Sequence, residues 1–203
     1  MNQPLFTTNR NIILASASPR RQSFLQELGL QFTTKPAAID ETPEPEESAE
    51  DFVRRMAAGK AESIAGLRPD AVVIGADTVI SHQGEILGKP ASRAEALTIL
   101  QKLQGTSHIV MTALALYCRE DNLAATLVGA TTVTFGRFPK EVLESYIRSG
   151  EPMDKAGAYA IQGQGGFLIE QINGSCSTVI GLPMNELVTL LLSHGVISAY
   201  QAE

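Results

Sequence analysis

One short stretch near the start of the chain, residues 12–21, constrains the fold more than any other. Its three apolar residues at 12–14 are typical of a short β-strand, and the small residues that follow let a backbone approach a bound group closely. Ser18 is a favourable N-cap, and Pro19 suits the first position of a helix. We therefore expect a strand, a tight turn and a helix that ends at Gly29.

Two arginines, Arg20 and Arg21, lie in the first turn of this predicted helix. Cations are unfavourable there, because the N-terminus is the positive end of the helix dipole. The free backbone N–H groups and the two guanidinium groups together suit an anion, and phosphate fits them best. The alternative is a pair of solvated surface arginines, but the strand, the small-residue turn and the Ser-Pro pair favour the anion site.

The rest of the chain alternates between strand-like and helix-like segments. Strands are expected at residues 30–34, 70–80, 108–118, 127–135 and 167–172, and helices at residues 48–67, 92–103, 139–149 and 183–194. A turn at Gln83 and Gly84 predicts a hairpin that ends the strand at residues 70–80. This order favours an α/β fold with a mixed sheet, and we find no linker between domains.

The composition narrows the function classes. Of the 203 residues, 44% are apolar and 19% are charged, as in a soluble globular protein. The net charge of -6 argues against a nucleic-acid partner, because an acidic protein gains nothing from counterion release. The chain has no apolar run of membrane length and no secretory leader, so we expect a cytoplasmic protein with no membrane partner. Cys118 and Cys176 are expected to be reduced thiols.

Charged side chains gather at the ends of elements and in glycine-containing loops: Arg20, Arg21, Glu41, Lys60, Asp77, Lys89, Asp154 and Lys155. Asp77 is expected at the end of a buried strand, where open α/β sheets bind ligands, with a turn cap as an equal alternative. Lys60, taken alone, would be a surface residue of its helix. Two carboxylates with several cations suit metal-assisted hydrolysis of a phosphate ester. The sequence contains no P-loop, G-x-S-x-G or H-E-x-x-H motif.

A set of short motifs, in order over about residues 12–195, resembles the Maf family of nucleotide pyrophosphatases. They include S-A-S-P-R-R, G-A-D-T-V, L-G-K-P, E-P-x-D-K-A-G-A-Y-x-I-Q-G and V-I-G-L-P. The resemblance implies an α/β fold with an elongated, bent mixed sheet flanked by helices and a central cleft, similar to the inosine triphosphate pyrophosphatases. We expect an N-terminal extension at residues 1–11, one domain of two lobes at residues 12–197 and a tail at residues 198–203.

The resemblance also implies a reaction. A water molecule attacks the α-phosphorus of a nucleoside triphosphate, with Mg²⁺ or Mn²⁺ as cofactor, and gives the monophosphate and pyrophosphate. The segment D-K-A-G-A-Y-x-I-Q-G resembles the branch that acts on dTTP and UTP. Gln162 lies in this segment, and its amide can offer one donor and one acceptor to the O4 and N3–H edge of thymine or uracil.

The resemblance assigns roles to single residues. Asp77 is implied as the proton acceptor; Arg20, Thr78 and Gln162 as specificity residues; Ser16, Arg21, Lys60 and Lys89 as phosphate-binding residues; and Glu41 and Asp77 as metal ligands. A homodimer is implied by the resemblance alone. Cys176 stands where the family usually has Tyr, so packing or base stacking at this position would differ.

Two other functions remain open from the sequence. One is a nucleotide-binding regulator of cell division or septum formation without turnover, and the other is a house-cleaning enzyme for modified nucleotides. Asp77 favours an enzyme, because a carboxylate beside phosphates repels a merely bound ligand unless a metal intervenes.

Overall fold

The structure is a computed structural model that describes residues 4–201, and it contains a seven-stranded mixed sheet and a separate two-stranded sheet. The strands are β1 (Phe6–Thr8), β2 (Ile12–Leu14), β3 (Thr33–Thr34), β4 (Val72–His82), β5 (Glu85–Leu87), β6 (Ser107–Cys118), β7 (Leu123–Phe135), β8 (Ile169–Asn173) and β9 (Ile197–Ala199). The helices are α1 (Pro19–Glu27), α2 (Ala49–Ala65), α3 (Arg93–Leu103), α4 (Lys140–Arg148), α5 (Cys176–Ile180) and α6 (Met184–Ser193). Three 3-10 turns are η1 (Glu151–Asp154), η2 (Ala156–Ala158) and η3 (Gln164–Leu168).

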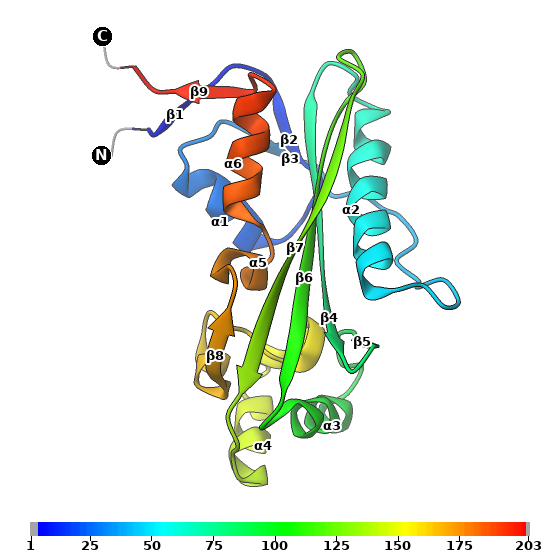
Figure 1. The fold of residues 1–203 in the computed structure, drawn as a ribbon, viewed down its shortest axis with the longest axis vertical. Helices are drawn as coiled ribbons and strands as arrows, with labels where there is room; N and C mark the ends of the chain where they lie inside the picture. The colour runs from blue at the N-terminus through cyan, green and yellow to red at the C-terminus, as the bar shows by residue number, and fades with distance from the viewer. Residues whose placement is uncertain (1–3, 202–203) are drawn as a thin grey trace.

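The large sheet has the order β3-β2-β4-β6-β7-β8, and β5 pairs with β4 outside this path. β2 is parallel to β3 and β4, whereas β4, β6, β7 and β8 form an antiparallel ladder. β4, β6 and β7 run along the longest axis of the molecule (Figure 1). α2 lies on one side of these strands, α1 and α6 lie on the other, and α3 and α4 lie at the lower end (Figure 1). The predicted α/β class with a mixed sheet is confirmed.

The two faces of β6 pack against different helices. Leu114 and Leu116 belong to a cluster with the buried leucines of α6, whereas Ala113 and Ala115 belong to the cluster beneath α2. Small residues on the α2 side let this helix lie close to the sheet. At Gly75 the approach is so close that a Cβ atom would overlap the carbonyl oxygen of Ala57. This contact fixes the position of α2 relative to β4.

The structure departs from the expected elements at several places. β7 begins at Leu123, four residues before the expected start, and the segment expected as a strand from residue 167 begins with η3, so that β8 starts at Ile169. α5 was not expected from the sequence. β1 and β9 pair antiparallel, although neither segment was assigned a strand. Within residues 4–201, no helix combines the length and apolar character needed to cross a membrane.

A buried aromatic cluster surrounds His108, which lies near the start of β6. The Nε2 atom of His108 lies 2.8 Å from the Tyr159 hydroxyl, and both rings make edge contacts with Phe135. His108 is only 2% exposed. Burial, helped by the neighbouring His82, lowers the pKa of His108 to about 4. The imidazole is therefore neutral in the folded protein at neutral pH.

His108 predicts a pH dependence of stability. Between pH 6.5, its ordinary pKa, and pH 4, the unfolded chain binds a proton at this residue that the folded chain does not. We expect the free energy of unfolding to fall by up to about 3 kcal/mol as the pH is lowered through this range. Urea titrations at successive pH values measure it. His108→Gln should remove the fall, and the exposed control His194→Gln should keep it; an unchanged fall in His108→Gln would contradict the assignment.

Candidate functional site

The edge of β4 opposite β6 has a gap in its strand pairing. β6 pairs with β4 over residues 73–81, whereas the other edge pairs with β2 at residues 72–74 and with β5 at residues 80–82. Residues 75–79 therefore have no strand partner on that edge within the described chain. A cleft of about 910 Å³ opens beside this gap. The topology thus places a cavity next to the middle of β4, on the edge that faces away from β6.

All nine candidate site residues of the sequence analysis line this one cleft: Ser16, Arg20, Arg21, Glu41, Lys60, Asp77, Thr78, Lys89 and Gln162. They come from the turn before α1, α1 itself, the loop before α2, α2, β4, and the loops that follow β5 and η2. Asp154 and Lys155 line the cleft as well, and they pair with each other. The structure therefore brings together residues that are far apart in the chain.

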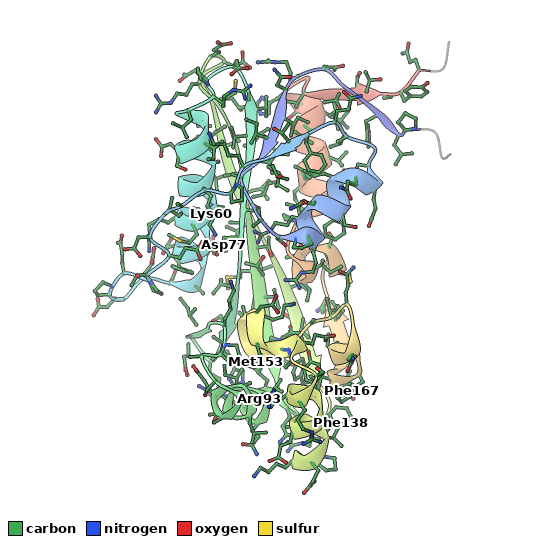
Figure 2. The ribbon with its side chains drawn as sticks, turned by 180° about the vertical axis from the view of Figure 1, so that it is seen from behind. Lys60, Asp77, Arg93, Phe138, Met153 and Phe167 are labelled. Carbon is green, nitrogen blue, oxygen red and sulfur yellow. The ribbon has the colours of Figure 1, made fainter. Side chains whose placement is uncertain are left out.

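Lys60 connects the two acidic residues of the cleft. Its Nζ atom lies 2.7 Å from Oδ1 of Asp77 and 2.7 Å from Oε1 of Glu41. Lys60 is 8% exposed, so the alternative of a surface lysine is wrong. In Figure 2 Lys60 and Asp77 lie next to each other at mid-height of the molecule. The hydrogen bond from Lys60 holds the pKa of Glu41 below its usual value.

The sequence predicted Asp77 at the end of its strand, and this prediction is wrong. β4 continues to His82, because β6 stays paired with it beyond Asp77. The carboxylate of Asp77 binds the ammonium group of Lys60 on α2. A turn cap is excluded, since the residue lies in the middle of a strand. The observed contact instead makes Asp77 part of the charged wall of the cleft.

The N-terminus of α1 is open toward ligands. Ser18 occupies the N-cap position, but its side chain makes no capping hydrogen bond, and the first turn contains no acidic residue. The Nε atom of Arg20 is buried and has no hydrogen-bond partner within residues 4–201. Arg20 also lines the cleft. An anion in the cleft could accept hydrogen bonds from this guanidinium and from the helix N-terminus.

Within the described chain Arg21, unlike Arg20, makes several hydrogen bonds to the surrounding protein. It donates from Nε to the carbonyl oxygen of Gly181 at 2.7 Å, and from Nη1 to the carbonyl oxygen of Ala76 at 2.9 Å and to Ser16 Oγ at 3.1 Å. Nη2 donates to Thr78 Oγ1 at 3.0 Å. Burial lowers the pKa of Arg21. Because a guanidinium has five N–H groups, these contacts leave one for a ligand.

Thr78 belongs to a directed chain of hydrogen bonds. Thr112 Oγ1 donates to the carbonyl oxygen of Thr178 at 2.7 Å and lies 2.9 Å from Thr78 Oγ1. Since each hydroxyl has one proton, Thr78 donates to Thr112 and accepts from Arg21. The proton of Thr78 therefore points inward, and this hydroxyl can only accept from a ligand.

Other contacts of the cleft were not apparent from the sequence. Apolar side chains line it beside the charged ones: Phe52, Val79, Ile80, Tyr159, Val179 and Ile180. The amide of Gly157 donates to the carbonyl oxygen of Gly88 at 3.0 Å, which joins the two loops that carry Lys155 and Lys89. Cys176 is exposed and does not line the cleft, so it is not placed to stack on a bound base there.

The residues present limit how a metal could bind. Within residues 4–201, no group of three or more His, Cys, Asp or Glu residues could hold an ion. Glu41 and Asp77 supply two carboxylates on one wall of the cleft. Mg²⁺ commonly binds through one or two carboxylates together with waters and substrate phosphates. The pair therefore suits a divalent ion that arrives with a phosphate ligand.

Because Arg21 is hydrogen-bonded to the protein and Arg20, within the described residues, is not, substitution of the two arginines should lower the free energy of unfolding by different amounts. Arg21→Lys removes the planar donor set and leaves buried carbonyl oxygens unpaired, so we expect the free energy of unfolding to fall by about 2–4 kcal/mol. Arg20→Lys, the matched control on the same helix turn, should lose less than about 1 kcal/mol, because no hydrogen bond of Arg20 is seen in the described chain. Urea unfolding measures both, and equal losses would contradict the structural role of Arg21.

Comparison with known proteins adds a family match. The family described as "Maf-like protein" matches residues 11–194. A protein of Desulfotalea psychrophila is 43% identical over 194 residues, which cover 96% of this chain and 100% of the relative. A protein of Myxococcus xanthus is 47% identical over 185 residues, covering 91% of this chain and 93% of the relative.

A protein of Syntrophus aciditrophicus is 45% identical over 184 residues, covering 91% of this chain and 90% of the relative. All three relatives are named dTTP/UTP pyrophosphatase. The similarity spans the whole cleft, since every residue that lines it falls within the family match.

Proposed function

The chain belongs to the Maf family, and we propose that it is a nucleoside triphosphate pyrophosphatase that hydrolyses dTTP and UTP to the monophosphate and pyrophosphate. The names of its relatives support this activity. One structural observation carries the proposal. A single cleft holds the open N-terminus of α1, the Glu41–Lys60–Asp77 group and the exposed side chain of Gln162. The cleft can therefore bind the phosphates of one nucleotide, activate the attacking water and recognise the base at the same time.

We also propose the shape of the sheet and the division of the chain. The long strands β4, β6 and β7 have α1, α2 and α6 beside their upper part and α3 and α4 at their lower end (Figure 1), and this arrangement supports an elongated, bent sheet of the inosine triphosphate pyrophosphatase type. The division into residues 1–11, 12–197 and 198–203 stays part of this proposal. The pairing of β1 with β9 makes the extension and the tail neighbours in space.

The triphosphate would lie between α1 and the lysines. Arg20 has donors to spare, Lys89 is exposed without an ion pair in the described chain, and Lys60 is held at the cleft wall. Arg21 and Ser16 hold the backbone around this site and can add single contacts. These cations would neutralise charge that develops on phosphoryl oxygens as the anhydride bond breaks.

Asp77 is proposed as the proton acceptor. Oδ1 of Asp77 accepts from Lys60, while no hydrogen bond to Oδ2 occurs within residues 4–201. Oδ2 can therefore take the proton of a water molecule that attacks the α-phosphorus. A new P–O bond forms to this water, the bond to the bridging oxygen breaks, and pyrophosphate leaves with the electron pair.

Glu41 and Asp77 would hold the divalent cation, Mg²⁺ or Mn²⁺. Their oxygen donors are the type that both ions prefer. When bound, such an ion would neutralise charge on the phosphates and make water more acidic. Lys60 already pairs with both carboxylates, so its positive charge offsets their mutual repulsion before the ligand arrives.

Base selection is proposed for Gln162, Thr78 and Arg20. Gln162 is exposed at the cleft and can turn its amide toward a pyrimidine edge. Thr78 offers only an acceptor, which fits a donor such as a ring N–H. The apolar side chains of Val179 and Ile180 line the same cleft and can contact the faces of a base.

The proposed activity predicts a specific product. With Mg²⁺ or Mn²⁺, the purified protein should convert dTTP and UTP to the monophosphate and pyrophosphate, which chromatography of the nucleotide and a coupled pyrophosphate assay measure together. A panel of modified pyrimidine nucleotides tests the house-cleaning alternative. Release of orthophosphate alone would contradict the proposed reaction. Nucleotide binding without any turnover would favour the regulatory function.

The role of Asp77 predicts a loss of turnover with binding retained. Asp77→Asn keeps the shape and removes the charge, so kcat should fall by roughly 10²–10⁴-fold, the usual contribution of a general base. Nucleotide binding, measured by calorimetry, should persist. Glu44→Gln serves as a control, because this exposed carboxylate lies outside the cleft lining. A kcat near wild type in Asp77→Asn would remove Asp77 from the mechanism and leave Glu41 as the candidate.

A further inference from the structure

Two side chains outside the cleft hold the loop that carries Gln162. Glu151, in η1, accepts hydrogen bonds from the backbone amides of Gln164 through Oε2 and of Gly165 through Oε1, both at 2.9 Å. Tyr146, in α4, accepts from the amide of Ala160 at 3.2 Å. Neither Glu151 nor Tyr146 lines the cleft. The loop is thus anchored on both sides of Gln162.

The two anchors are also bonded to each other. The Tyr146 hydroxyl donates to Oε1 of Glu151 at 2.9 Å, so one connected network joins both ends of the loop at residues 160–165. Tyr146 is 4% exposed, and burial raises the pKa of its phenol, which stays protonated and able to donate. Burial also raises the pKa of Glu151, but its hydrogen bonds outweigh this effect and keep the pKa below the usual value. Glu151 is therefore an ionised acceptor near neutral pH.

The glycines of the loop make room for these anchors. Gly163 has a φ of +121°, and a Cβ atom there would lie 2.5 Å from Oε2 of Glu151. A Cβ atom at Gly165 would overlap the Tyr146 hydroxyl oxygen. Both positions let the backbone approach its anchors closely. In the segment Q-G-Q-G-G, the first and second glycines have this structural reason.

We propose that Glu151 and Tyr146 are positioning residues that set base selectivity by fixing the loop that presents Gln162 to the substrate. The proposal rests on the proposed function, in which Gln162 meets the pyrimidine edge. A side chain held in place before binding loses less freedom on binding, so it discriminates better between bases. The carboxylate is suited to this task, because it can accept from three donors at once.

The first variant is Glu151→Gln. Its amide nitrogen would face an N–H or O–H donor, so at least one anchoring bond is lost while the shape is kept. We expect KM for UTP and dTTP to rise about tenfold, with kcat changed less than about threefold, because the charged group at Asp77 is untouched. Activity on a purine nucleotide such as GTP should hardly change, so selectivity falls. Glu144→Gln on α4 is the matched control, since Glu144 pairs with Lys140 and lies outside the lining of the cleft.

A double-variant cycle separates positioning from general damage. Gln162→Ala alone should lower kcat/KM for UTP, and adding Glu151→Gln should lower it little further if Glu151 acts through Gln162. Fully additive effects would overturn the proposal. Should Glu151→Gln not fold, Tyr146→Phe removes the two bonds of the Tyr146 hydroxyl, from the Ala160 amide and to Glu151, and it is also expected to lower selectivity.

Amide hydrogen exchange gives a readout that does not need turnover. In Glu151→Gln the amides of Gln164 and Gly165 should exchange faster, whereas amides of the β4–β6 ladder should keep their protection. If exchange is faster in Glu151→Gln but the wild type has no activity, the proposed function is wrong, whereas the anchoring of the loop by Glu151 is supported. Unchanged exchange, or unchanged selectivity with an active wild type, would overturn the positioning role.

Discussion

The unpaired edge of β4 at residues 75–79 is the constraint on which the cleft depends. β6 pairs with one edge of β4 over residues 73–81, while β2 and β5 cover only the two ends of the other edge. Backbone groups in such a gap need partners, because an unpaired buried polar group is unfavourable. Arg21 satisfies the carbonyl of Ala76 from the side of α1. The gap therefore draws α1 to the sheet and leaves space for a ligand beside it.

The cleft is lined by several cations, although the protein as a whole has a negative net charge. The chain carries a net charge of -6, yet Arg20, Lys60, Lys89 and Lys155 all line one cavity. Two carboxylates, on Glu41 and Asp77, share one ammonium group at its wall. Because opposite charges compensate locally, the cleft can accept a polyanion without burying isolated charges. This balance supports phosphoryl chemistry rather than simple retention of a phosphate.

Local patterns explain which parts of the fold were predictable. The strand β2, the start of α1 after Ser18 and the helix that begins near residue 92 follow from short-range rules, and all three occur as predicted. At α3 the Glu95 amide donates to Ser92 Oγ, which caps the helix. Asp77 was wrongly expected at a strand end because the apolar run stops there, whereas strand length depends on a partner and β6 pairs on past Asp77. The pairing of β1 with β9 joins segments from opposite ends of the chain, so no local pattern could indicate it.

The sequence by itself determined the alternation of strands and helices, the anion-suited turn before α1, and the set of charged and amide side chains available for chemistry. These features depend on residue type and on spacing of a few positions. Only the tertiary structure decided how those side chains are used. It buries Lys60 against Asp77, commits Arg21 to the backbone while Arg20 faces the cleft, and lets Glu151 hold a loop 13 and 14 residues away. The physical reason is that hydrogen bonds and ion pairs form between groups that packing brings within about 3 Å, whatever their separation along the chain.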